Sequence, residues 1–144
     1  MIRKLAPLLL ALFISESTLA REAKSALSFS IKIESVTLHY SSRSLYHGAL
    51  GLGWCTSFEW PCQNELSEDQ KDVIQKRLTD VFEFERDSLH LRKLKTWKNQ
   101  ISFQYDEVSN LAAMTSLRSQ RRFFYSKDDQ FIGSDIQPLN GGLR

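Results

Sequence analysis

The sequence is poor in glycine, proline and net charge, and each scarcity excludes a class of protein. Six glycines and three prolines among 144 residues are too few for collagen or for a low-complexity chain. A hydrophobic content of 42% with 11% aromatic residues also excludes a disordered chain. The formal net charge of +2 argues against a dedicated nucleic-acid-binding surface. These values indicate one globular domain with a single core.

The sequence also lacks the short motifs that carry common enzyme chemistries. We find no glycine-rich phosphate loop, no H-E-x-x-H zinc motif and no G-x-S-x-G nucleophile motif. The glycines of GALGLG lack the preceding strand and the following helix that a nucleotide site needs. We therefore expect no cofactor, and the sequence assigns no catalytic residue.

Long hydrophobic runs are absent except near the N-terminus. A cationic start, an apolar run at 5–14 and small residues at Thr18 and Ala20 predict a bacterial signal peptide at 1–20. The run is too short for a membrane-spanning helix. Removing these 20 of the 144 residues leaves 124. We expect an exported protein, periplasmic or secreted, with no stable membrane insertion after cleavage.

The chain has two cysteines, Cys55 and Cys62, which lie seven positions apart in WCTSFEWPC. In an oxidising compartment they can form a disulfide, which would close a small loop and contribute about 2–3 kcal/mol. A free thiol pair and a cysteine linked to a partner are the alternatives. We expect no metal site, because the C-x6-C spacing is wide and His39, His47 and His90 are scattered.

Alternating apolar and polar residues predict a domain rich in β structure. The period-two runs at 28–34 and 36–40 indicate two strands, or one strand broken by a bulge. Short runs with polar breaks recur after residue 88 and are typical of antiparallel hairpins. We expect an α+β fold, with mainly antiparallel β hairpins and one amphipathic helix packed on the sheet.

Three glycines punctuate the apolar stretch that precedes a strand predicted at 54–60. Glycine permits backbone conformations closed to other residues and lets neighbouring chain approach closely. We predict a tightly packed turn region here, and Pro61 limits the strand because proline cannot donate to a sheet. The three glycines are Gly48, Gly51 and Gly53.

One segment has the features of a helix, which we place at about 68–83. Ser67 is a good N-cap with Gln70 at the third position of the helix. Glu68 and Asp69 suit the positive end of the helix dipole. The apolar residues predicted to share one face are Val73, Ile74, Leu78, Val81 and Phe82.

Two groups of residues could supply enzyme chemistry, a cysteine–histidine pair and a cluster of carboxylates. Cys55 with His39 or His47 as base could supply a nucleophile, although the expected disulfide would abolish it. Neighbouring carboxylates could serve acid–base chemistry if two of them faced a cleft, but such clusters at a helix end are ordinarily solvated. These carboxylates are Glu83, Glu85 and Asp87.

Basic and aromatic side chains interleave in two stretches, 92–98 and 118–125. Such stretches can bind polyanions, including lipopolysaccharide and anionic glycans. Strands also carry lysine and arginine on a solvated face or as edge protection, and the near-neutral net charge favours that simpler interpretation. The possible binding face consists of Lys93, Lys95, Trp97, Arg121 and Arg122.

The last third of the chain repeats itself at an offset of twenty residues. Each unit is a strand ending in tyrosine, a polar turn of about five residues, and a return strand that opens on an apolar residue. We expect the tyrosine and the apolar residue to pack across the hairpin, and polar side chains to bond the turn backbone. The equivalent pairs are Tyr105 with Tyr125, Asn110 with Gln130, and Leu111 with Phe131.

The first unit resembles the repeat of the bacterial Rhs/YD-repeat family, which reads Tyr-Asp, a few residues, Gly-Asn or Gly-Arg, and then Leu. Tyr105 and Asp106 match its start, and Asn110 and Leu111 match its end. Ser109 stands where the family usually has glycine.

The second unit keeps Tyr125 and Phe131 but has Ser126 in place of the aspartate. An earlier segment, LHYSSRSLYHGALGLGWCTSFEW, is similar to the block that opens proteins of this family. Its matching residues are Tyr40, Ser41, Ser42, Arg43, Gly48, Gly51, Gly53 and Trp54.

Large members of the family wind dozens of such hairpins into a hollow β-shell that encloses a toxin or displays a binding surface. A chain of 124 residues cannot enclose anything. The resemblance therefore implies an exported interaction protein of the bacterial envelope or surface, a short relative or fragment of an Rhs-type toxin system. We expect its partner to be a protein or an envelope glycan, bound through strand edges or the aromatic and basic face, and not nucleic acid. The alternative is a small secreted effector or hydrolase that uses a cysteine or carboxylate site.

Overall fold

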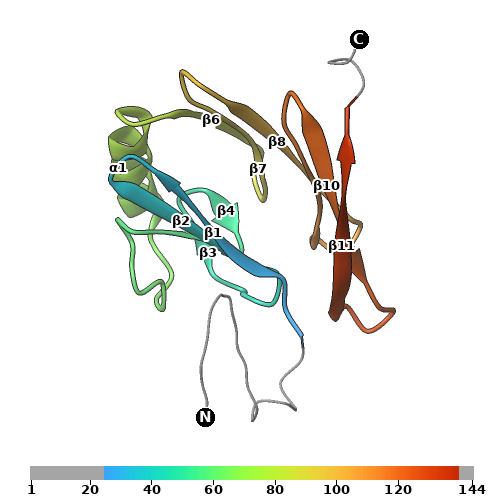
Figure 1. Ribbon diagram of the computed structural model, residues 1–144. Helices are drawn as coiled ribbons and strands as arrows, with labels where there is room; N and C mark the ends of the chain where they lie inside the picture. The colour runs from blue at the N-terminus through green and yellow to red at the C-terminus, as the bar shows by residue number, and fades with distance from the viewer. Residues whose placement is uncertain (1–24, 140–144) are drawn as a thin grey trace, which may run out of the picture.

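The computed structural model describes residues 25–139, so the predicted signal peptide at 1–20 lies outside the described residues. Two antiparallel sheets face one another as two layers, and one helix lies beside them (Figure 1). The expected α+β class, with mainly antiparallel hairpins and one helix, is confirmed.

The N-terminal layer is a three-stranded sheet in the order β1-β2-β5, accompanied by a small β3–β4 hairpin. β1 and β2 are the two strands predicted from the period-two runs. The strand predicted at 54–60 was too long and ends at Thr56, because the Glu59 carboxylate accepts hydrogen bonds from the Thr56 N–H and Oγ1 and turns the chain. The elements are β1 (Ser28–Ile33), β2 (Val36–Ser41), β3 (His47–Gly48), β4 (Gly51–Leu52) and β5 (Trp54–Thr56).

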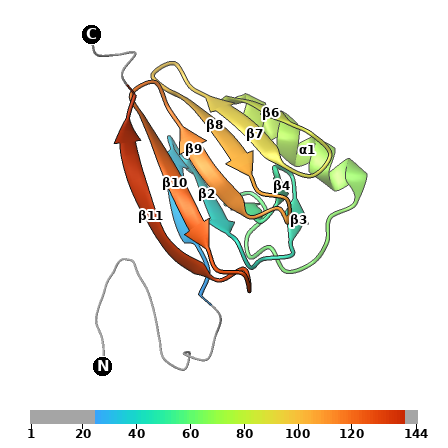
Figure 2. The same cartoon turned by 90° about the vertical axis from the view of Figure 1, so that its right-hand side faces the viewer.

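The second layer is a six-stranded sheet in which every strand pairs with its neighbours in sequence, as Figure 2 shows. Its order, β11-β10-β9-β8-β7-β6, makes β11 and β6 the two end strands. The elements are β6 (Glu83–Arg86), β7 (Leu91–Lys95), β8 (Gln100–Tyr105), β9 (Leu111–Thr115), β10 (Ser119–Tyr125) and β11 (Phe131–Pro138).

Helix α1 (Glu68–Thr79) begins as predicted, since Ser67 and Gln70 form a capping box. It ends four residues before the predicted end at 83. The Val81 and Phe82 N–H groups both donate to the Leu78 carbonyl, which tightens the last turn and directs the Phe82 ring into the core. The predicted apolar face was also wrong in part, because the side chain of Val73 is exposed.

The core lies between the two layers and is centred on Trp54. The Trp54 ring is 5.1 Å from the Tyr40 ring and 5.1 Å from the Phe103 ring, measured between centroids. Phe29 of β1 stacks on Phe123 of β10 across the layers at 6.3 Å. Aromatic contacts therefore join the two sheets into one unit.

Candidate functional site: the repeated hairpins

The six-stranded sheet contains three equivalent hairpins, one more than the sequence repeat predicts. They are β6–β7, β8–β9 and β10–β11, with turns at 87–90, 106–110 and 126–130. In each hairpin the register shifts beside the turn. The residues paired across these shifts are Arg86 with Leu91, Tyr105 with Leu111, and Tyr125 with Phe131.

The three turns share one hydrogen-bonding scheme. The Asp106 Oδ1 atom accepts from the N–H groups of Val108 and Asn110 at 3.0 and 2.9 Å. Asp87 and Ser126 accept two turn N–H groups in the same way, at distances of 2.7 to 3.2 Å. The Ser126 hydroxyl thus accepts the two turn hydrogen bonds that the aspartate accepts in the other units.

Two turn residues have left-handed backbones at equivalent positions. Ser109 has a φ of 71° and Asp129 a φ of 64°. Ser109 is the residue that stands where the YD-repeat pattern has glycine, and glycine is the residue that adopts this conformation most readily. The departure from the pattern at this position therefore changes the residue but keeps the backbone geometry.

The second and third hairpins are each tied to the preceding hairpin by a tyrosine. The Tyr105 hydroxyl donates to the Leu91 carbonyl at 2.7 Å, and the Tyr125 hydroxyl donates to the Leu111 carbonyl at 2.8 Å. Burial raises the pKa of both tyrosines above the usual range, so both hydroxyls remain donors at neutral pH.

Adjacent turns are also bonded to each other through their side chains. The His90 Nε2 atom and the Ser109 hydroxyl form a hydrogen bond of 2.9 Å between the first and second turns. The Asn110 amide donates to the Asp129 carboxylate at 3.3 Å between the second and third. The Asn110 side chain, which was expected to bond its own turn backbone, instead bonds the Asp106 carboxylate of its own turn and the Asp129 carboxylate of the next, and so links two neighbouring hairpins.

Sequence reasoning missed the β6–β7 hairpin because it lacks the most visible signals. Arg86 occupies the tyrosine position, and its turn is one residue shorter than the other two. The remaining signal is the spacing of the return strands, since Leu91, Leu111 and Phe131 follow one another at intervals of twenty residues.

All three hairpins are fixed at their turns to the N-terminal layer, and we call this side of the sheet the anchored end. The Leu89 carbonyl accepts from the Leu52 N–H at 2.8 Å. The Leu111 N–H donates to the Tyr40 hydroxyl at 3.0 Å, and the Phe131 N–H donates to the Ser25 carbonyl at 3.2 Å. At least one hydrogen bond therefore joins each hairpin to the N-terminal layer.

The glycine block and the first YD-like unit, which are far apart in the sequence, meet at the anchored end. The Trp54 Nε1–H donates to the Tyr105 hydroxyl at 3.1 Å. Gly51 has a φ of 114°, and a Cβ there would lie 2.7 Å from the Leu89 carbonyl oxygen. Gly53 is buried against the Tyr40 ring, whereas Arg43 is exposed. The predicted close approach at the glycines is therefore present at Gly51.

Cys55 and Cys62 form a disulfide with their Cα atoms 6.0 Å apart, as expected. The loop that it closes contains Glu59, whose carboxylate accepts from the Tyr46 hydroxyl at 2.7 Å and from the Ala49 N–H at 3.1 Å. A Cβ at Gly48 would collide with this carboxylate and with the Tyr46 ring, so a larger residue there would displace both side chains. The disulfide loop therefore holds the β3–β4 hairpin that reaches the anchored end.

The structure does not gather the basic and aromatic residues onto one surface. Lys93 faces Glu85 at 4.0 Å, and Lys95 lies opposite Glu83 in the register.

The two arginines of the predicted face lie on β10. The Arg122 guanidinium binds the Asp135 carboxylate through two hydrogen bonds, of 3.0 and 2.7 Å. Arg121 points to the other face of the sheet, where its guanidinium donates to the Ser134 hydroxyl at 3.3 Å. Trp97 stands apart on the turn between β7 and β8, with 87% of its surface exposed.

Of the carboxylates considered for catalysis, Glu83 and Glu85 share a shallow pocket of about 330 Å³ on β6 and β7, where Lys93 and Lys95 also line it. Asp87 is held apart from them in its turn. The N–H groups of His90 and Leu89, together with Arg92, hold the pKa of Asp87 well below its usual range. Its carboxylate is therefore committed to the turn, while Glu83 and Glu85 are exposed on β6. Among residues 25–139, no group of three or more metal-ligating side chains could hold an ion.

His39 lies on the N-terminal sheet between two serine hydroxyls. Its ring nitrogens are 2.9 Å from the Ser30 oxygen and 3.2 Å from the Ser28 oxygen. Burial lowers the pKa of His39, which favours the neutral ring. It lies opposite Cys55 in the register, but the sulfur of Cys55 is in the disulfide.

Within the part of the chain that the structure describes, no helix is long and apolar enough to cross a membrane. No protein-family model, no curated protein and no solved structure matches this chain.

Proposed function

We propose that the protein is an exported, YD-repeat-like interaction protein of the bacterial envelope or surface, a short relative or fragment of an Rhs-type toxin system. It binds a partner polypeptide through the outer edge of β11, which has no strand neighbour on that side among residues 25–139. Export is supported by the signal-peptide pattern at 1–20 and by the disulfide, because disulfides persist in oxidising compartments. The resemblance to YD repeats is supported by the hydrogen bonds that the three turns share and by the two tyrosine hydroxyls that join neighbouring hairpins.

The observation that carries the binding site is the difference between the two end strands of the sheet. β6 lies beside α1, whereas β11 is an end strand with two exposed apolar side chains, Ile132 at 66% and Ile136 at 53% (Figure 1). An exposed, apolar edge strand is a template for an additional strand from another chain.

The repeat also suggests what the additional strand would contribute. Leu91 and Leu111 each accept a tyrosine hydroxyl from the following hairpin. Phe131 is the equivalent residue of the last hairpin, and the described residues contain no tyrosine that bonds its carbonyl. We therefore expect the partner strand to carry a tyrosine at this position.

Affinity capture with an edge-blocked variant tests the proposal. We expect the protein to retain a polypeptide from an envelope extract, and the double variant Ile132→Lys, Ile136→Lys to lose it, because charged side chains on an edge oppose strand pairing. Val108→Lys is the matched control, since Val108 is an exposed apolar residue on the 106–110 turn. Hydrogen exchange of the complex should show new protection in β11.

Equal capture by the edge variant and by the unsubstituted protein would overturn the β11 site. A folded protein that retains only a glycan would overturn the polypeptide partner, and one that retains nothing would overturn the binding function. Export is tested separately by mass spectrometry of the protein recovered from the periplasm or medium, where we expect the chain to begin at Arg21.

The alternative, a secreted effector or hydrolase, has less support. A cysteine nucleophile would require the Cys55–Cys62 disulfide to open, and Asp87 is committed to its turn. We therefore place it second.

A further inference from the structure

The other side of the six-stranded sheet carries a pattern that the proposed function does not use. We call it the open end, and it consists of the turns at 96–99 and 116–118, which both lie near the top of Figure 2. Trp97 is 87% exposed and Leu117 is 79% exposed. Each is followed by an exposed cation, Lys98 or Arg118. The two pairs are twenty residues apart, so the repeat itself places them at equivalent positions.

The two ends of the sheet differ in charge. Neither open-end turn contains a carboxylate, and no carboxylate of the described residues forms an ion pair with Lys98 or Arg118. The turns of the anchored end, by contrast, are rich in acids. These acids are Asp87, Asp106, Glu107, Asp128 and Asp129. An anionic surface would therefore attract the turn tips of the open end and repel those of the anchored end, while Glu34 and Glu83 lie behind the open-end tips.

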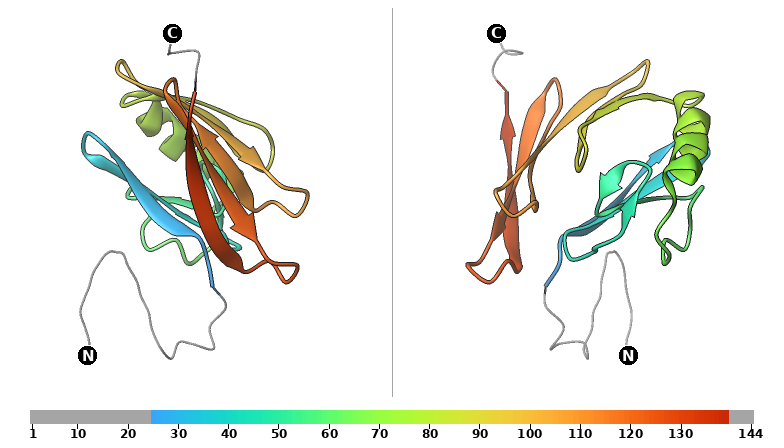
Figure 3. Two further views of the ribbon diagram at one scale, coloured as in Figure 1. Left: turned by 45° about the vertical axis from the view of Figure 1, so that its right-hand side comes forward. Right: turned by 180° about the vertical axis from the view of Figure 1, so that it is seen from behind.

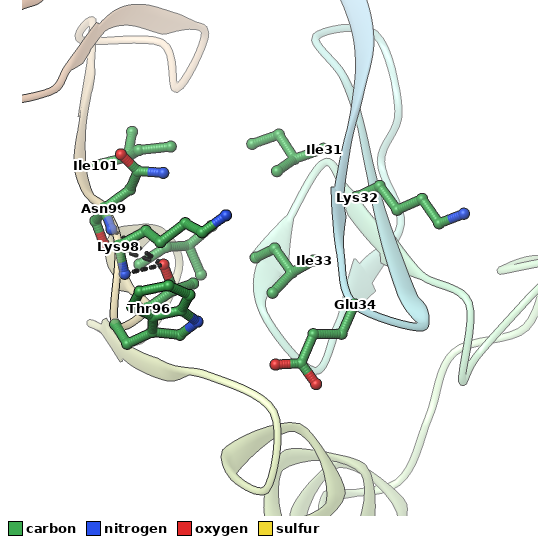
Figure 4. A pocket seen from close by; sticks show the side chains of 10 residues that line it. Ile31, Lys32, Ile33, Glu34, Thr96, Lys98, Asn99 and Ile101 are labelled. Carbon is green, nitrogen blue, oxygen red and sulfur yellow. Dashed lines mark hydrogen bonds between the residues drawn. The ribbon is translucent and has the colours of Figure 1, made fainter.

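An apolar groove opens beside the 96–99 turn. Its volume is about 280 Å³, and it is bounded by the β1–β2 turn and by the segment from β7 to β8. Figure 4 shows Ile31 and Ile33 pointing across it toward Ile101. Its charged lining residues are two lysines and one carboxylate, Lys32, Lys98 and Glu34. Apolar side chains between the two layers thus come close to the surface at the same end as Trp97.

We propose that the open end binds the surface of an anionic phospholipid bilayer. The side chains of Trp97 and Leu117 enter the interfacial region, where amphipathic tryptophan rings are favoured. Lys98 and Arg118 remain at the level of the lipid phosphates. The contact is peripheral, because only turn tips enter the lipid. It does not depend on the proposed β11 site, since it uses a different part of the sheet.

A bilayer fits these features better than a folded protein does. The two apolar side chains project singly from two separate turns, whereas a protein interface has a contiguous, closely packed apolar centre. A bilayer accepts projecting side chains without a matching cavity. An anionic glycan would use the cations but would leave Leu117 without an apolar environment.

Tryptophan fluorescence provides a test at a single residue. The full chain is expressed in bacteria and used in the form that the cells release, as two variants that each keep one exposed tryptophan. Trp60→Phe keeps Trp97, and Trp97→Phe keeps Trp60, which is 71% exposed on the disulfide loop. Trp54 is buried and common to both. With vesicles of phosphatidylglycerol and phosphatidylethanolamine carrying brominated acyl chains, we expect a blue shift and quenching only for the variant that keeps Trp97.

Charge reversal tests the role of the cations. The double variant Lys98→Glu, Arg118→Glu should bind the anionic vesicles at least about 25-fold more weakly, since each cation removed costs about fivefold. Lys127→Glu, an exposed lysine in the 126–130 turn, is the matched control and should leave the affinity unchanged. Thermal unfolding of each variant shows that the fold is intact.

Three results would overturn the proposal. They are equal quenching of the two tryptophan variants, equal binding to vesicles of phosphatidylcholine alone, and retention on an anionic polysaccharide without any binding to vesicles.

Discussion

The two ends of the six-stranded sheet are formed by the same hairpins but are held differently (Figure 3). At the anchored end, every turn has a hydrogen bond to the N-terminal layer. At the open end, the bonds stay within the second layer, for example from the Thr96 N–H to the Asn99 carbonyl at 2.8 Å and from the Leu139 N–H to the Arg118 carbonyl at 2.9 Å. The hydrogen bonds between the two layers are thus at the anchored end. The residues of the open-end turns are not needed for these bonds.

Substitution of Gly51 should have the largest effect on this arrangement. In Gly51→Ala the new Cβ would meet the Leu89 carbonyl, and the φ of 114° would be strained. We expect a loss of about 3–4 kcal/mol in the free energy of unfolding, from backbone strain and forced displacement together. Denaturant unfolding followed by fluorescence measures it.

Gly133→Ala on β11 is the matched control. Gly133 also has a positive φ, of 159°, but nothing lies within 4 Å of a Cβ built there. We expect a loss of about 1 kcal/mol or less. A loss at Gly133 as large as that at Gly51 would show that contact with the anchored end is not what makes Gly51 necessary.

Alkaline pH should weaken the anchored end next most strongly. Burial raises the pKa of Tyr40 to about 12, from 10.0 in the unfolded chain. The stabilisation is therefore fully present below pH 10 and is lost as the pH rises toward and through 12, by about 2–3 kcal/mol for this residue. Unfolding experiments between pH 9 and pH 12 measure the loss, and ultraviolet absorbance follows tyrosine ionisation.

Tyr40→Phe is the comparison for this titration. It should be less stable at neutral pH, because the Leu111 N–H loses its acceptor, and it should lose less on going to high pH. A Tyr40→Phe protein with the same alkaline dependence as the unsubstituted protein would contradict the assignment.

Removal of the hairpin tyrosine hydroxyls should have a moderate effect. Tyr125→Phe breaks the bond to the Leu111 carbonyl and removes a side-chain contact with the half-exposed Ser42, and should cost about 1 kcal/mol. Tyr105→Phe breaks the bond to the Leu91 carbonyl and also leaves the Trp54 Nε1–H without its acceptor, so we expect about 2 kcal/mol. Calorimetry of the two variants measures the difference, and equal losses would contradict the role of Trp54.

Truncation at the open end should have the smallest effect on stability. Trp97→Ala and Leu117→Ala remove exposed side chains from turns that do not contact the N-terminal layer by a hydrogen bond. We expect changes within about 0.5 kcal/mol. Thermal unfolding of both variants measures them. A larger loss would show that the open end also stabilises the fold.

The elements that were predicted correctly are those with local signals. Alternation indicated β1 and β2, the capping box fixed the start of α1, and the twenty-residue offset identified the last two hairpins. The end of α1 was wrong, because Phe82 turns into a core that only the tertiary structure defines. The strand from Trp54 ended early for a similar reason, since the Glu59 carboxylate turns the chain after Thr56.

The candidate site depended on contacts that no local pattern shows. The glycine block and the YD-like unit were identified separately, but their meeting through Trp54 and Tyr105, which are 51 positions apart, was not predicted. The opposite charge of the two ends is equally hidden, because the acidic and basic turns alternate along the chain and nearly cancel in the net charge. It becomes visible only when antiparallel pairing brings alternate turns to opposite ends.

Because the tyrosine bonds repeat from hairpin to hairpin, the number of hairpins in the sheet can change without a new kind of contact. Each hairpin carries its own turn bonds, and the two tyrosines connect neighbouring hairpins in the same geometry. A tandem duplication of residues 100–119 would add two strands in register, with a new tyrosine facing a new carbonyl. The gene could therefore lengthen or shorten in steps of sixty nucleotides while both ends of the sheet kept their chemistry.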